Sequence, residues 1–181
     1  DVPVAMADIS DLKMTIITND PAKRYYYTLL FGDKYRVKIA TRNVNIPGIQ
    51  NFRDLGGYPS YSTKKQVRWG MIYRSAEIDS LECYSRRELR NLGIKTLIDL
   101  RASSETGRQS PLQKEFNVVH IPLATGDMEN ILKGIREEKI KSDTVYRMVE
   151  RMNRILIDQY TKEYRQIFDI LLDKNSYPVV I

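Results

Sequence analysis

A length of 181 residues accommodates one ordinary domain with a small additional layer, and it is long enough to bury a hydrophobic core. An apolar fraction of 42% and a charged fraction of 29%, without low-complexity runs, exclude a disordered or fibrous chain. The net charge of +6 favours anionic partners. Because acids interrupt the basic residues all along the chain, this charge indicates a solvated surface and not a nucleic-acid patch.

The single cysteine, Cys83, excludes an internal disulfide framework and a multi-cysteine zinc site. No stretch approaches the roughly 18 consecutive apolar residues that a membrane span requires. The chain begins at Asp1 and not at methionine, which favours an exported protein whose signal has been removed. The compartment is otherwise open, as is the oligomeric state.

Residues 1–46 predict a β-rich N-terminal segment, which precedes a second domain over residues 47–181. Strands are expected at residues 12–18, 25–31 and 35–40, because these segments are rich in β-branched and aromatic residues. The short connection at residues 32–34 suits a hairpin. The segment therefore predicts a small sheet layer.

The second domain begins with a turn-rich segment and continues into a short strand and a helix. Ser85 and Glu88 have the spacing of a capping box, which places the start of the helix at Ser85. Gly93 stands where a helix C-terminus needs a left-handed residue. A strand is expected at residues 94–100, since this run is almost continuously apolar.

The remaining elements alternate in the same way. Residues 118–123 predict a strand, and apolar residues at intervals of three and four between 143 and 173 predict one long or two consecutive helices. Residues 177–181 have the composition of a central strand. In an open α/β sheet, ligands bind beyond the carboxyl ends of the strands, so chemistry is expected at that edge.

Three motifs occur in order along the second domain. Residues 51–58 read NFRDLGGY, residues 67–75 read VRWGMIYRS, and residues 92–101 read LGIKTLIDLR, with Glu105 four positions on. In this order and at this spacing they resemble the tyrosine/serine phosphatase family, and the resemblance extends over about residues 47–124.

The resemblance implies an α/β fold with a doubly wound sheet flanked by helices, here preceded by the small N-terminal β layer. It implies a phosphomonoester hydrolase that forms a cysteinyl-phosphate intermediate on a Cys-x5-Arg loop, with no metal or other cofactor. The substrate would be a phosphorylated protein or a phosphoinositide. By the family pattern this loop begins at the residue after Ile181, so the nucleophile is expected outside this sequence and the 181 residues alone are expected to be inactive.

Cys83 does not fit the pattern of the nucleophile. A phosphate-binding loop needs an arginine six positions after the cysteine, whereas position 89 is leucine. The five residues between them include no glycine and lie at the start of the predicted helix. Cys83 is therefore expected to be a structural or surface residue.

Five residues are candidates for binding the substrate: Arg53, Asp54, Arg74, Asp99 and Arg101. A guanidinium can hold a phosphate through two hydrogen bonds, and a carboxylate can orient it or a loop amide. Buried structural ion pairs are the alternative. The candidates at strand ends favour the functional reading.

The acid that protonates the leaving oxygen is expected to be Asp127, in a loop after the strand at 118–123. The alternative is that Asp127 caps the next helix. His120, the only histidine, is expected to be a hydrogen-bonded residue of the core or of a strand end and not to serve as a base or metal ligand.

A second function stands beside the enzyme, namely a non-catalytic module that binds phosphate or a partner surface. The sequence that follows Ile181 distinguishes the two, because an enzyme requires His-Cys there with an arginine six residues after the cysteine. A nucleic-acid binder would rest on the basic charge alone.

Overall fold

The structure is a computed structural model, and it describes residues 3–18, 23–32, 34–78, 81–106, 111–124, 128–137, 139–140 and 142–181. The chain divides into two compact units, Asp1–Thr41 and Arg42–Ile181. Each unit is described by itself below.

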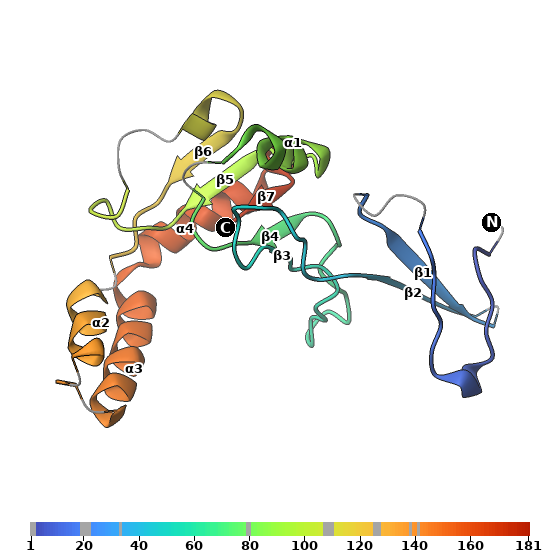
Figure 1. Ribbon diagram of the computed structural model, residues 1–181, viewed down its shortest axis with the longest axis horizontal. Coiled ribbons are helices and arrows are strands. Elements are labelled where there is room, and N and C mark those ends of the chain that lie inside the picture. The colour runs from blue at the N-terminus through green and yellow to red at the C-terminus, as the bar shows by residue number, and fades with distance from the viewer. Residues whose placement is uncertain are drawn as a thin grey trace. The chain divides into compact units, whose positions relative to one another are not determined.

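The first unit is built around an antiparallel hairpin (Figure 1). Strand β1 (Tyr26–Phe31) pairs with β2 (Tyr35–Ala40), with Tyr26 opposite Ala40. The predicted hairpin is thus confirmed. None of the residues described in this unit is buried.

The strand expected at residues 12–18 is absent, and that prediction is wrong. Leu12 has a φ of 50° and ends a short 3-10 helix, η1 (Ile9–Asp11), and the residues that follow form no regular structure. Leu12 is 92% exposed and Ile17 is 89% exposed. A β-rich composition yields a strand only where a neighbouring strand receives its backbone hydrogen bonds, and none does so here.

A five-stranded sheet forms the centre of the second unit, with the order β3-β4-β7-β5-β6. Its strands are β3 (Arg53–Asp54), β4 (Ile72–Arg74), β5 (Thr96–Asp99), β6 (Asn117–His120) and β7 (Val179–Val180). Strands β4, β7, β5 and β6 are parallel, and β3 runs antiparallel to β4. The expected α/β class is confirmed, as is the central position of the final strand.

Helices cover both faces of this sheet (Figure 1). Helix α1 (Cys83–Asn91) places Leu89 in a buried cluster with Tyr73, Leu97 and Val180. Helix α4 (Thr161–Leu172) places Ile167 in a second cluster with Ile98 and Val179. Consecutive strand residues point to opposite faces, so these two clusters lie on opposite sides of the sheet.

The two ends of α1 differ in how well the sequence predicted them. Gly93 has a φ of 73° and donates to the carbonyl of Arg90, and Ile94 donates to that of Leu89, so the predicted glycine C-terminus is confirmed. The predicted capping box is wrong. The helix begins at Cys83, and Ser85 lies inside its first turn, where its hydroxyl donates to the carbonyl of Pro47 at 2.6 Å. The Ser85 hydroxyl thus bonds to a carbonyl that is distant in sequence, whereas the predicted cap required it to bond within the first turn of the helix.

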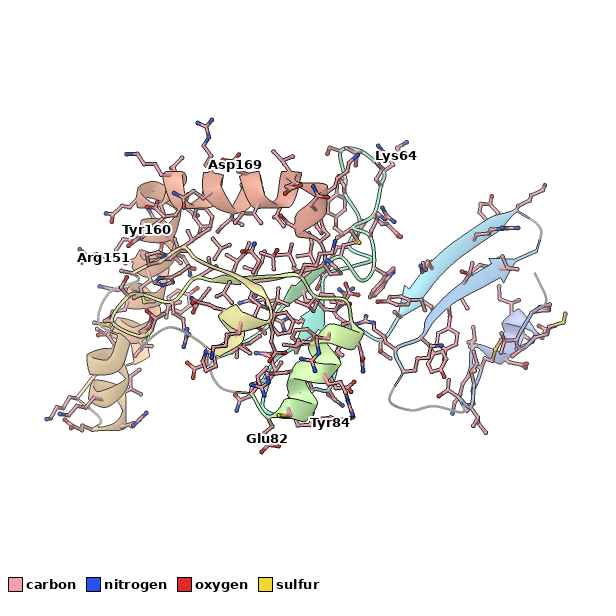
Figure 2. The ribbon with its side chains drawn as sticks, turned by 90° about the horizontal axis from the view of Figure 1, so that it is seen from above. Lys64, Glu82, Tyr84, Arg151, Tyr160 and Asp169 are labelled. Carbon is pink, nitrogen blue, oxygen red and sulfur yellow. The ribbon has the colours of Figure 1, made fainter. Side chains whose placement is uncertain are left out.

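The C-terminal part of the chain is helical up to the last strand. Helix α2 (Met128–Arg136) and α3 (Ser142–Gln159) precede α4, with the 3-10 helices η2 (Pro111–Lys114) and η3 (Lys174–Ser176) beside them in sequence. The region expected to be helical is thus two consecutive helices. They meet at Tyr160, labelled in Figure 2, whose hydroxyl donates to the carbonyl of Ala124 at 2.7 Å. Within the described residues, no helix combines the length and the apolar character needed to cross a membrane.

Candidate active site at the carboxyl edge of the sheet

The predicted strand-end residues converge on one edge of the sheet. Arg74, Asp99 and His120 are the last residues of β4, β5 and β6, and Ile181 follows β7. The four strands are parallel, so their carboxyl ends meet at this edge. The end of β7 is held there, because Ile181 donates to the carbonyl of Tyr73 and accepts from the amide of Ser75.

Two arginines lie directly opposite each other at this edge. Arg53 is the register partner of Arg74 across β3 and β4, so both side chains leave the same face of the sheet. Arg74 is exposed and Arg53 is half-buried. The one hydrogen bond described for the guanidinium of Arg53 is a long contact of 3.4 Å to Asn51 Oδ1. The pair presents two positive charges to the same side.

Asp54 points to the opposite face and is fully buried. Its Oδ1 accepts from the amide of Gly56 and its Oδ2 from the amide of Gly70, both at 2.7 Å. Of the roles open to this carboxylate, the geometry supports the orientation of loop amides. The carboxylate and the Arg53 guanidinium leave opposite faces of a two-residue strand.

Asp99 and Arg101 form an ion pair at the end of β5. Arg101 Nη2 donates to Asp99 Oδ2 at 2.8 Å, Nε donates to the same carboxylate, and the backbone amide of Arg101 donates to Oδ1. Glu77 lies 3.7 Å from Arg101 Nη1. Burial by itself raises the pKa of Asp99, but the hydrogen bonds and charge of Arg101, with the charge of His120, outweigh it and lower that pKa.

Two further residues order the loop that follows β5. His120 Nε2 donates to the carbonyl of Arg101 at 2.8 Å, which is the strand-end hydrogen bond expected for it. The carboxylate of Glu105 accepts from the amide of Ala102 at 2.7 Å. Glu105 therefore holds the turn that the third motif encodes.

Two further residues, Cys83 and Asp127, were considered for catalysis. Cys83 is exposed at the start of α1, where its Sγ accepts from Arg86 Nη2, and Leu89, six positions on, is fully buried in the core. Asp127, the candidate acid, lies outside the described residues. Among the residues that the structure describes, no three His, Cys, Asp or Glu side chains are grouped to hold a metal ion.

Sequence reasoning missed Arg42, which precedes all three motifs. Its Nη1 donates to the carbonyl of Asp54 at 2.9 Å and to that of Gly56 at 3.0 Å. Its guanidinium lies 4.0 Å from the ring centroid of Tyr58 and 5.3 Å from that of Trp69. No local pattern marks an arginine at this position, since its partners are 12 to 27 residues away.

Comparison with known proteins agrees with the motifs. A model of the tyrosine phosphatase family matches residues 44–181. Over 66 residues, the chain is 39% identical to the triple specificity protein phosphatase PtpB of Mycobacterium tuberculosis. This match covers 36% of the chain and 22% of that relative, so the chain spans about a fifth of the relative's length. Because the family model matches most of this chain, the chain belongs to the tyrosine phosphatase family.

Proposed function

We propose that this protein hydrolyses phosphomonoesters through a cysteinyl-phosphate intermediate. One observation carries the proposal: Arg53, Arg74 and Arg101 come to a single edge of a mostly parallel sheet, beside the end of its central strand β7. In open α/β folds this is the edge at which ligands bind. Phosphorylated protein is the substrate class that the family implies, and a phosphoinositide is a further candidate.

In the proposed reaction, a loop supplies the nucleophile, and residues at this edge of the sheet bind the phosphate. A thiolate from a Cys-x5-Arg loop, which the family pattern places directly after Ile181, attacks phosphorus. The ester P–O bond breaks, and an acid, for which Asp127 is the candidate, protonates the leaving oxygen. Water then cleaves the S–P bond, which releases inorganic phosphate and the thiolate.

The residues of this chain would bind and orient the phosphate. Arg74 is one strand from β7 and Arg53 is two, with adjacent strands about 4.8 Å apart. Their guanidinium groups would neutralise the nonbridging oxygens. Arg101 already donates to Asp99 through Nε and Nη2, so it would act chiefly by holding the loop after β5 in place.

The test is turnover by the protein expressed with its native flanking sequence. Hydrolysis of p-nitrophenyl phosphate, with a phosphoenzyme trapped by acid quench, is the expected result. Replacing the loop cysteine by serine should abolish both. A protein that binds orthophosphate but neither hydrolyses the ester nor forms the phosphoenzyme would be the non-catalytic module instead.

The 181-residue chain alone gives the complementary result. Cys83 is the only cysteine in it and lies on α1 without a following arginine in the required position. We expect no turnover from this chain under conditions in which the protein with its flanking sequence is active.

A further inference from the structure

Arg42 ties together the loop that joins β3 to β4. Its guanidinium donates to the carbonyl of Asp54, the last residue of β3, and to that of Gly56 in the loop, and it lies over the rings of Tyr58 and Trp69. Its backbone carbonyl accepts from the amide of Asp54 at 2.9 Å. We call Arg42, Asp54, Tyr58 and Trp69 the Arg42 cluster.

The buried carboxylate of Asp54 also holds this loop. Its carboxylate bridges the amides of Gly56 and Gly70, which are the two ends of the loop. Trp69 packs directly on Gly56 and Gly57, and a Cβ on Gly56 would lie 2.4 Å from Trp69 Cα. The loop is therefore closed at its base, while Lys64 lies at its far end (Figure 2).

The strands on either side of this loop are too short to determine their own pairing. Strand β3 has two residues and β4 has three. A shift of one residue in the register of a strand moves every side chain to the other face. Such a shift would turn Arg53 towards the buried face and Asp54 out of it.

The native register also opposes like charges, because Arg53 faces Arg74. Like charges directly opposite one another destabilise an antiparallel pair. The register is therefore supported from outside the pair. Strand β7 pairs with β4, Asn43 forms a bridge to Arg53, and the hydrogen bonds of Arg42 and Asp54 hold the loop between the two strands.

We propose that Arg42 is a positioning residue of the phosphate site. This assignment rests on the proposed function, since Arg53 and Arg74 are the phosphate contacts that Arg42 would position. By fixing the loop between β3 and β4, Arg42 keeps both arginines on the same face at the edge beside β7. Lysine is a poor replacement, because its ammonium group could donate to the two carbonyls that Nη1 contacts but has no planar guanidinium to lie over the rings of Tyr58 and Trp69.

The experiment compares Arg42→Lys and Arg42→Gln with a matched control, Arg68→Gln, in the protein with its native flanking sequence. Arg68 lies in the same loop, is exposed, and has no contact described for its side chain. The readouts are KM and kcat for p-nitrophenyl phosphate, orthophosphate affinity by calorimetry, and thermal stability. Emission of Trp69, the only tryptophan in this chain, reports whether the cluster has changed.

We expect both Arg42 variants to raise KM and to weaken orthophosphate binding by about tenfold, while kcat stays within about threefold. The reason is that displaced Arg53 and Arg74 would bind the phosphate less tightly, and by the same amount in the ground state and in the transition state. Arg68→Gln should stay within about twofold in every readout. Trp69 emission should shift in the Arg42 variants only.

The proposal is overturned if the Arg42 variants keep the wild-type KM and phosphate affinity and lose only kcat and thermal stability, which is the signature of a purely structural residue. It is also overturned if Arg68→Gln has the same effect. If the wild type has no turnover, the proposed function fails while orthophosphate affinity still tests Arg42. A wild type that binds no orthophosphate would refute both.

Discussion

Arg53 and Arg74 stand directly opposite each other on two antiparallel strands, with both guanidinium groups on one face. Within the described residues, neither side chain forms an ion pair with a carboxylate. Elsewhere the chain neutralises such groups, as with Arg101 by Asp99 and Arg90 by Glu115. An opposed cationic pair lowers stability, and the proposed binding of phosphate at this edge gives a physical reason for it.

Replacing either arginine should therefore separate stability from binding. For Arg53→Gln and Arg74→Gln we expect the free energy of unfolding to stay equal or rise by about 0.2–1 kcal/mol, since the repulsion is removed. Orthophosphate affinity should fall about tenfold, and more for Arg74, because β4 is adjacent to β7. Urea unfolding and calorimetry measure the two quantities, with Arg68→Gln as the control. Unchanged phosphate affinity in both variants would contradict the assignment.

The ion pair of Asp99 and Arg101 predicts a pH dependence of stability. The folded-state pKa of Asp99 lies below its ordinary value of 3.8, so its contribution is present above that value and is lost as pH falls through the folded pKa. Asp99→Asn should therefore destabilise the protein at pH 7, and the difference from wild type should shrink below about pH 4. Urea unfolding at several pH values measures this difference in the free energy of unfolding. A difference of equal size at pH 3 and pH 7 would show that the charge of Asp99 is not what stabilises the loop.

Gly56 of the first motif and Gly93 of the third motif should respond differently to alanine. At Gly93 an added Cβ would meet no atom within 4 Å, and only the φ of 73° is unfavourable, so Gly93→Ala should cost about 1–2 kcal/mol. At Gly56 the Cβ would lie 2.4 Å from the Trp69 backbone, which forces the loop to move. Gly56→Ala should therefore also raise KM, while Gly93→Ala should not. Equal KM values for the two variants would argue against coupling between this loop and the site.

Cys83 should be dispensable for turnover. Its thiol is exposed and accepts from Arg86, and the residue six positions on is the buried Leu89, where a phosphate-binding loop needs an arginine. Cys83→Ser, in the protein with its native flanking sequence, should keep kcat/KM for p-nitrophenyl phosphate within about twofold. If turnover disappeared instead, Cys83 would be the nucleophile and the proposed mechanism would be wrong.

Local sequence was sufficient wherever the cause of a structure is local. The hairpin of β1 and β2, the end of α1 at Gly93 and the helices before residue 173 follow from strand composition, a left-handed glycine and helical periodicity. Strand-end positions also placed Arg74 and Asp99 correctly at one edge, because parallel strands share their carboxyl side.

The failures all involve partners distant in the chain. Residues 12–18 have the composition of a strand but no neighbour to pair with. Ser85 has the spacing of a cap but donates to Pro47, 38 residues away. Asp54 is not among these failures, because the sequence left open whether its carboxylate orients a phosphate, orients a loop amide or forms a buried ion pair. Alternation along the two-residue strand β3 turns that carboxylate to the buried face, where it accepts from two loop amides.

The family, the α/β class and the residue types at the ends of the strands could be recognised from the sequence alone. Three features are visible only in the tertiary structure. Arg53 and Arg74 share a face of the sheet, Arg101 forms an ion pair with Asp99, and Arg42 donates hydrogen bonds that hold the loop between β3 and β4. The physical reason is that composition and periodicity act within one element, whereas strand register and long-range hydrogen bonds exist only after distant segments have met.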